Sequence, residues 1–244
     1  MAITHAKLQD GSDNVNRSTY TVPEASDTDL DVDKLYLLSL ATRIVTAPAF
    51  APTGVTQTGA TWVKIDDQLF ETADGWNISI WRTMVGSAVT AQDISVAFGA
   101  TFRHLLWSLS EFDGVDKSGT DGSGAIVQSG KNEFGQDVDP SITLSAFGSA
   151  DNRPYSANGI ESSTMTGVAP GLDTEITEIL NIESDSLHTQ WDSATADNTV
   201  DSTHSASGTI FSNGMVALEI KIEDVAPSPF LVPHFYRPNT LRRL

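Results

Sequence analysis

The chain has 244 residues and is strongly acidic, with 32 Asp and Glu against 14 Lys and Arg, which gives a net charge of −18. It holds no cysteine, which excludes disulfides and thiolate metal centres, and no apolar run of about 18 residues, which excludes a membrane-spanning helix. The excess of carboxylates repels phosphate groups, so the acidic part of the chain is not expected to bind nucleic acid.

Apolar residues recur at every second position along most of the chain, which predicts β-strands rather than helices. The clearest example is residues 76–85 (WNISIWRTMV), with Trp76, Ile78 and Ile80 on one face. Short clusters of Gly, Ser, Asn and Asp separate the strands and indicate turns. In chain order, strands are expected at residues 18–22, 34–43, 61–70, 76–85, 93–98, 103–112, 125–129, 141–144, 156–162, 175–184, 188–192, 209–211 and 215–222.

About thirteen short strands with no convincing helix predict an all-β fold, a two-sheet antiparallel sandwich of jelly-roll type. Residues 174–182 (TEITEILNI) also have partial helical spacing, but their Ile and Thr content favours a strand. The small polar residues 193–207 are expected to form an exposed loop or an edge strand. Long loops are expected at residues 47–60, 113–124 and 130–140.

Residues 225–244 (VAPSPFLVPHFYRPNTLRRL) differ in chemistry from residues 1–224, which are expected to form one acidic domain. The segment contains three Arg, four Pro and no Asp or Glu. Proline disfavours a helix and favours an extended chain, which at about 3.1 Å per residue reaches roughly 60 Å. Disordered tails are poor in aromatic residues, so we expect an arm that docks on another chain rather than a free tail. The expected contact residues are Phe230, Leu231, Phe235, Tyr236, Arg237, Leu241, Arg242, Arg243 and Leu244.

Five segments in the middle of the chain carry a resemblance to a known family. They are residues 35–43 (LYLLSLATR), 59–65 (GATWVKI), 81–90 (WRTMVGSAVT), 93–99 (DISVAFG) and 107–129 (WSLSEFDGVDKSGTDGSGAIVQS), of which the last is the most specific. Together they resemble β-sandwich proteins encoded in the structural gene blocks of tailed bacteriophages and tailed archaeal viruses. The resemblance does not extend to the arm.

The resemblance implies a virion location, with other virion proteins as partners, and brings no catalytic residues. We expect a non-enzymatic structural protein that forms a homo-oligomer and joins the capsid, neck or tail through its arm. A decoration, turret or tail-associated position suits the acidic domain better than contact with packaged genome. The alternatives are a glycan- or receptor-binding sandwich of a tail fibre or surface protein, and a hydrolase.

Trp81 is the residue on which the glycan-binding alternative depends. It lies on the opposite face of its strand from Trp76, beside Asn77, Ser79 and Thr83. One interpretation is an exposed aromatic that contacts a neighbouring subunit or a host glycan. The other is a second buried layer.

No cofactor is expected, and the metal candidates are weak. Asp113, Asp116 and Asp121 lie in the glycine-rich segment FDGVDKSGTDGSG, where carboxylates and carbonyls suit Ca²⁺. Tight turns at Asp-Gly and Ser-Gly explain the same residues and are favoured. Residues 27–33 (DTDLDVD) alternate carboxylates but lack the Gly and Glu positions of an EF-hand loop.

Catalytic motifs are not evident. The chain has no G-x-S-x-G nucleophile elbow, and its five histidines lack the spacing of a zinc site. Structural roles are therefore expected for the histidines, and the protein is not expected to be an enzyme.

Overall fold

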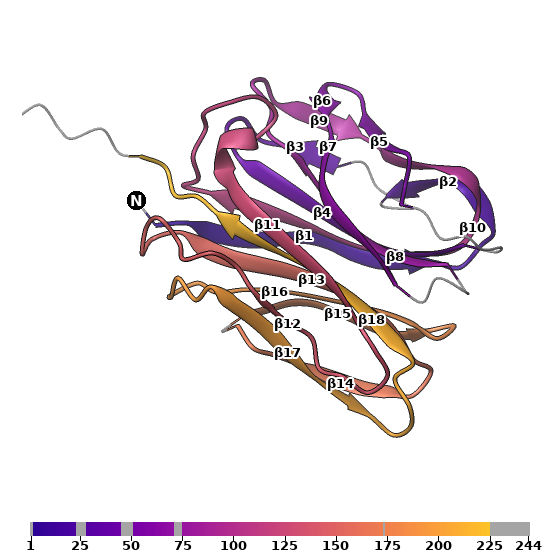
Figure 1. The fold of residues 1–244 in the computed structure, drawn as a ribbon. Helices are drawn as coiled ribbons and strands as arrows, with labels where there is room; N and C mark the ends of the chain where they lie inside the picture. The colour runs from indigo at the N-terminus through magenta and orange to yellow at the C-terminus, as the bar shows by residue number, and fades with distance from the viewer. Residues whose placement is uncertain (1, 23–27, 45–50, 71–74, 173, 225–244) are drawn as a thin grey trace, which may run out of the picture.

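The structure is a computed structural model that describes residues 2–22, 28–44, 51–70, 75–172 and 174–224. Strands dominate, and the helical content of these residues is one 3-10 turn, η1 (Ser123–Ala125). The prediction of an all-β, sandwich-like fold with antiparallel sheets is confirmed (Figure 1). The arm, residues 225–244, lies outside the described residues.

The largest sheet has eight strands and is organised around β10 (Ile94–Asp113), which is 20 residues long. The first part of β10 pairs with β2 and β5, and the second part pairs with β1 and β4. Residues 93–98 and 103–112, expected as two strands, therefore belong to one curled strand. Six strands follow the order β6-β5-β10-β4-β8-β7, and β1 and β2 also pair with β10. The bounds of the strands other than β10 are β1 (Thr4–Asp13), β2 (Arg17–Val22), β4 (Leu35–Ile44), β5 (Gly54–Gln57), β6 (Ala60–Thr61), β7 (Val63–Phe70) and β8 (Trp76–Thr83).

A five-stranded sheet packs against one face of the eight-stranded sheet. Its order is β11-β18-β13-β16-β15, with β11 (Ile126–Phe134), β13 (Arg153–Glu161), β15 (Thr174–Ile182), β16 (Asp185–Trp191) and β18 (Ser212–Ile220). The described residues also form two smaller sheets. One has three strands, β12 (Ser141–Thr143), β17 (Thr199–Ala206) and β14 (Met165–Pro170), and the other is a pair of β3 (Thr28–Leu30) and β9 (Val89–Gln92).

The central strands β4 and β8 of the eight-stranded sheet are buried on both faces, which explains the continuous apolar run of β4. Leu35 and Leu37 point into the main core, which lies between the two large sheets. Tyr36 and Leu38 point the other way, into a second core enclosed by the curl of β10 and its neighbours. A strand with both faces buried needs apolar residues at consecutive positions, whereas a half-buried strand needs them only at alternate ones.

Phe70 fixes the approach of the two large sheets. Its ring lies over Gly159 on β13 and Gly214 on β18, which are paired in register. A Cβ atom at Gly214 would lie 2.4 Å from the Phe70 ring, which is closer than real Cβ contacts allow. The two glycines thus leave the space that the aromatic ring fills.

The outer face of the five-stranded sheet is covered by the three-stranded sheet (Figure 1). Two small apolar clusters join them. One contains Met215 and Val200, and the other contains Ile160 and Val168. A third layer of sheet was not expected from the sequence, and it accounts for the burial of every residue of β13, β16 and β18.

Among the local predictions for individual segments, one is confirmed and others are corrected. Residues 174–182 form a strand, as expected. Residues 193–207, expected as a loop or an edge strand, contain β17, the middle strand of its sheet. Residues 209–211 form no strand, and β1 and β14 were not expected.

Candidate functional site

One group of ionisable side chains among the described residues joins the two large sheets. His104, from β10, is fully buried and faces the turn between β15 and β16. Glu183 and Ser184 form this turn with positive φ angles of 49° and 78°, a left-handed conformation that reverses the chain sharply. Asp185, the first residue of β16, is 2% exposed beneath it.

Both ring nitrogens of His104 face carboxylate oxygens. Nδ1 contacts Oδ2 of Asp185, and Nε2 lies 3.0 Å from Oε2 of Glu183. The guanidinium of Arg103 donates to the same Glu183 oxygen at 2.9 Å. Arg43 donates to the Glu183 carbonyl and stacks its guanidinium 4.6 Å from the Trp76 ring centroid.

This geometry requires a shared proton. Two hydrogen bonds between one imidazole and two carboxyl groups need two protons, held as an imidazolium or as a neutral ring beside one protonated acid. Burial raises the pKa of Asp185 and its hydrogen bond from His104 lowers it, with a net value of about 6. Hydrogen bonds from Arg103 and His104 lower the pKa of Glu183. Of the two carboxyl groups, Asp185 is therefore the one that is protonated more readily.

The cluster resembles a general-base arrangement, but its access is wrong for catalysis. A catalytic base must reach the proton that it abstracts from a substrate. His104 is 0% exposed and Asp185 is 2% exposed, so neither meets solvent. The group therefore acts as a buried polar tie between β10 and β16. The sequence carried no signal for it, because its members are separated by about 80 residues.

The three aspartates considered for Ca²⁺ do not converge. Asp113 accepts the backbone N–H of Gly114, and the backbone carbonyl of Asp121 accepts from Arg82. Asp116 accepts from Lys221 Nζ at 2.5 Å and from the Ser118 backbone. Burial raises the pKa of Asp116 and these hydrogen bonds lower it, with a net value of about 2.

These contacts correct the weak metal hypothesis for Asp113, Asp116 and Asp121. The carboxylates of Asp113 and Asp116 are engaged by turns and a lysine, and Asp121 lies in a turn with a φ angle of 51°. Gly119 and Gly122 have φ angles of 80° and 78°, which is the left-handed conformation that tight turns need. Throughout the described residues, no group of three His, Cys, Asp or Glu is placed to hold a metal ion.

Trp81 is buried, which corrects its assignment as a surface aromatic. It is 6% exposed, packs in the second core, and donates its indole N–H to Ser79 Oγ at 3.2 Å. The sequence placed Trp81 correctly on the face opposite Trp76. It could not show that the curled β10 covers that face. The glycan-binding alternative therefore loses the residue on which it depended.

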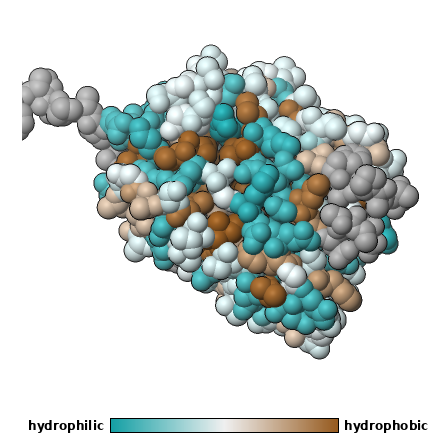
Figure 2. Space-filling model, viewed as in Figure 1, coloured by the Kyte–Doolittle hydropathy of each residue, from teal (hydrophilic) through white to brown (hydrophobic). Residues whose placement is uncertain are grey.

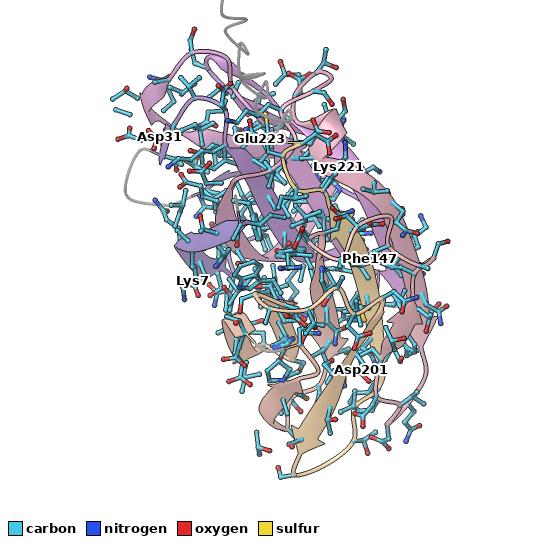
Figure 3. All side chains as sticks on the ribbon, turned by 90° about the vertical axis from the view of Figure 1, so that its left-hand side faces the viewer. Lys7, Asp31, Phe147, Asp201, Lys221 and Glu223 are labelled. Atoms are coloured by element: carbon cyan, nitrogen blue, oxygen red, sulfur yellow. The ribbon has the colours of Figure 1, made fainter. Side chains whose placement is uncertain are left out.

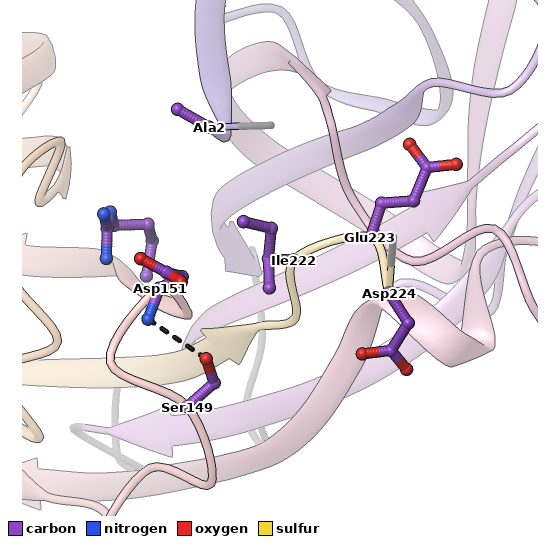
Figure 4. Close-up of a pocket in the computed structure, with 7 residues that line it drawn as sticks. Ala2, Ser149, Asp151, Ile222, Glu223 and Asp224 are labelled. Carbon is purple, nitrogen blue, oxygen red and sulfur yellow. Dashed lines mark hydrogen bonds between the residues drawn. The ribbon is translucent and has the colours of Figure 1, made fainter. Parts of the chain in front are cut away.

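One surface pocket lies where the described chain ends, beside the strand β18. Its volume is about 490 Å³, and Figure 4 shows Ala2, Ile222, Glu223 and Asp224 around it. Two of its carboxylates are already paired: Glu223 with Lys117 at 3.3 Å and Asp224 with Lys221 at 2.8 Å. Figure 3 shows Lys221 and Glu223 together at this end of the molecule.

A smaller pocket of about 270 Å³ lies between the glycine-rich loop and the turn after β8. It is lined by Asp33, Lys117 and Asp121 among others. Both pockets are open to solvent, and the lining of the smaller one is about equally polar and apolar. The face in Figure 2 is mainly hydrophilic, with hydrophobic residues in small groups.

Comparison with known proteins adds no assignment. No family model, no curated protein and no solved structure matches the chain. Within the described ranges, no helix is long and apolar enough to cross a membrane.

Proposed function

We propose that this protein is a non-enzymatic structural component of a tailed-virus particle. It is an accessory protein on the capsid, neck or tail, and it attaches through residues 225–244. Other virion proteins, including further copies of the chain, are its partners. The sequence resemblance of residues 30–222 supplies the viral setting.

The observation that carries the proposal is the separation of charge along the chain. Residues 1–224 hold all 32 acidic residues and 11 of the 14 basic ones, whereas residues 225–244 hold three Arg and no acid. Like-charged bodies repel one another unless a specific contact joins them. A basic segment with aromatic anchors supplies such a contact, because Arg and aromatic side chains dominate the energetics of interfaces.

The body of the protein supports a structural role. Two cores lie on either side of one continuous sheet, and His104 and Asp185 are buried between the two large sheets. Few large apolar side chains of the described residues are exposed: Leu8, Val15, Val32, Val127, Val138 and Phe211.

Truncation of the arm tests the proposal. A variant lacking residues 226–244 should retain its β-sheet circular dichroism and its melting transition but be absent from purified virus particles, as measured by quantitative mass spectrometry. Incorporation of the truncated chain at the normal level would contradict attachment through the arm. Absence of the full-length chain from particles would contradict the virion role itself.

Two substitution sets separate the contributions within the arm. Replacing Phe230, Phe235 and Tyr236 with Ser removes the apolar anchors, and replacing the three arginines with Gln removes the charge. We expect both variants to be incorporated less than the wild type. Only in the arginine variant should the remaining incorporation depend less on salt concentration than it does in the wild type. Asp197→Asn, a single charge change on the body, is the matched control and should leave incorporation unchanged.

A further inference from the structure

The two faces of the five-stranded sheet differ in polarity. The inner face, toward the main core, carries Leu187, Trp191 and Leu218. On the outer face, β13 and β16 place polar residues toward the three-stranded sheet, although all of them are buried. These polar residues are Ser156, Asn158, Ser186, His188 and Gln190.

A histidine seam, formed by Asn158, His188 and His204, lies at the centre of this outer interface. Asn158 on β13 and His188 on β16 are paired in register. The Asn158 amide nitrogen lies 2.8 Å from Nε2 of His204 on β17. The seam therefore spans the contact between the five-stranded sheet and the three-stranded sheet.

The seam contains several unsatisfied polar atoms. Among the described residues, neither ring nitrogen of His188 has a hydrogen-bond partner, and the same holds for Nδ1 of His204 and Oδ1 of Asn158. His188 is 1% exposed, so bulk water does not compensate for the missing partners. A buried, unsatisfied polar group costs about 1–3 kcal/mol, and a buried charge costs more.

Carboxylates lie around the seam. Glu175 Oε2 on β15 lies 3.6 Å from His188 Nε2, which is within ion-pair distance but beyond hydrogen-bond length, and Glu175 is 40% exposed, so solvent screens its charge. Glu178 on β15 accepts the backbone N–H of Val168, and Asp139 accepts the backbone N–H of His204. Burial lowers the pKa of both histidines to about 4, with His204 further lowering that of His188 and Asp139 opposing the shift at His204.

The apolar support of this interface is limited. The cluster of Met215 and Val200 and the cluster of Ile160 and Val168 flank the seam. The main core, by contrast, draws on β4, β7, β8 and β10 of the eight-stranded sheet and on all five strands of the other large sheet. Separation of the three-stranded sheet therefore exposes far less apolar surface than separation of the two large sheets. Its opening has the lower free energy and is the local opening that we expect to occur.

We propose that the three-stranded sheet is an acid-released flap: protonation of His188 and His204 detaches β12, β17 and β14 from the five-stranded sheet while the two large sheets stay packed. At neutral pH both imidazoles are uncharged and the flap is closed. Once protonated, each ring gains hydration only if the flap opens. The inference concerns this interface alone and does not depend on the proposed virion role.

Hydrogen exchange of the full-length chain tests the flap. Protection factors, corrected for intrinsic exchange, are compared at about pH 7.5 and about pH 5 for β17 and β14, with β4 and β8 as internal references. A shift of a buried histidine from its ordinary pKa of 6.5 to about 4 predicts a loss of protection of roughly 30-fold per histidine at about pH 5. The reference strands should keep most of their protection.

The double variant His188→Gln/His204→Gln keeps polar side chains in the seam but removes the titration. Its β17 protection should change little between the two pH values. His5→Gln is the matched control: burial also lowers the pKa of His5 to about 4, but its ring packs on Phe112 and Trp191 in the main sandwich. This control should retain the acid-induced loss at β17.

Three outcomes would overturn the proposal. One is an unchanged protection of β17 in the wild type at about pH 5. Another is an equal loss in the double-histidine variant. The last is a simultaneous loss in β4 and β17, which would indicate global unfolding instead of local release.

Discussion

The hydroxyl group of Tyr155 on β13 lies 2.7 Å from Oγ of Ser39 on β4, and both side chains are fully buried. This hydrogen bond joins the two large sheets within the core between them, where Ser108 on β10 and Thr177 on β15 make a second such contact at 2.8 Å. Burial raises the pKa of Tyr155 to about 12, so the phenol stays protonated across the physiological range.

Tyr155→Phe should lower the free energy of unfolding by about 1–2 kcal/mol, because Ser39 is left without its partner in a dry core. Urea denaturation measures the change. The double variant Tyr155→Phe/Ser39→Ala removes both polar groups and should be less destabilised than the sum of the single variants. Strict additivity would show that the two hydroxyl groups do not interact.

Gly214→Ala should be destabilising because of the Phe70 ring above it. The added methyl group would have to displace the ring or the sheet, and overpacking of this kind costs about 1–3 kcal/mol. Gly135→Ala, where a Cβ atom meets nothing within 4 Å, is the control and should change the melting temperature little. Combining Gly214→Ala with Phe70→Leu should recover part of the loss.

Asp185→Asn should change how stability depends on pH. The folded-state pKa of about 6 lies above the ordinary value of 3.8. The proton-linked contribution of Asp185 is therefore fully present below pH 3.8 and is lost as pH rises through 6. Relative to the Asn variant, the wild type should lose on the order of 2 kcal/mol between these values, as measured by denaturant titration at each pH. Parallel curves for the two proteins would contradict the assignment of the proton to Asp185.

Trp81→Ala should destabilise the protein by about 3–5 kcal/mol, as expected for a large aromatic removed from a core. A surface aromatic would cost far less. The matched comparison is Phe211→Ala, at a side chain that is 54% exposed, which should be nearly neutral in thermal melting. A small effect at Trp81 would contradict its burial in the second core.

Added salt should stabilise the protein. With a net charge of −18, repulsion between carboxylates opposes the compact state, and salt screens it over about 10 Å at 0.1 M. The melting temperature should rise between low and moderate NaCl concentrations, and a fall would show that ion pairs such as Lys34 with Glu111 outweigh the repulsion.

The strands with strong local patterns could be predicted from the sequence. Residues 34–43 and 76–85 alternate or run apolar, and both form central strands close to the expected bounds. β1 escaped prediction because its residues are mostly exposed and polar, and it becomes a strand only by pairing with β10. For β17 the sequence allowed an edge strand but did not predict its middle position, which its small polar residues gain from β12 and β14 on either side.

The buried polar groups could not be predicted from the sequence. Their partners are distant in the chain, as with His104 and Asp185, and their positions are set by how the sheets stack. Alternation of apolar residues placed Trp81 on the right face of its strand but did not reveal a second core. That core depends on the curl of β10, and the two halves of β10 each resemble an independent strand in the sequence. The local pattern predicts on which face of a strand a side chain lies, and long-range packing decides whether that face is exposed to solvent.

The length of β10 has a consequence for biosynthesis. Because β1, β2, β4 and β5 all pair with residues 94–113, none of these early strands can complete its hydrogen bonding until that segment has left the ribosome. The N-terminal third of the chain therefore emerges with apolar edges that lack partners, the condition under which nascent β-proteins aggregate. Slower translation before residue 94 should lengthen that exposed interval and lower the yield of soluble protein, whereas slower translation after residue 113 should have less effect.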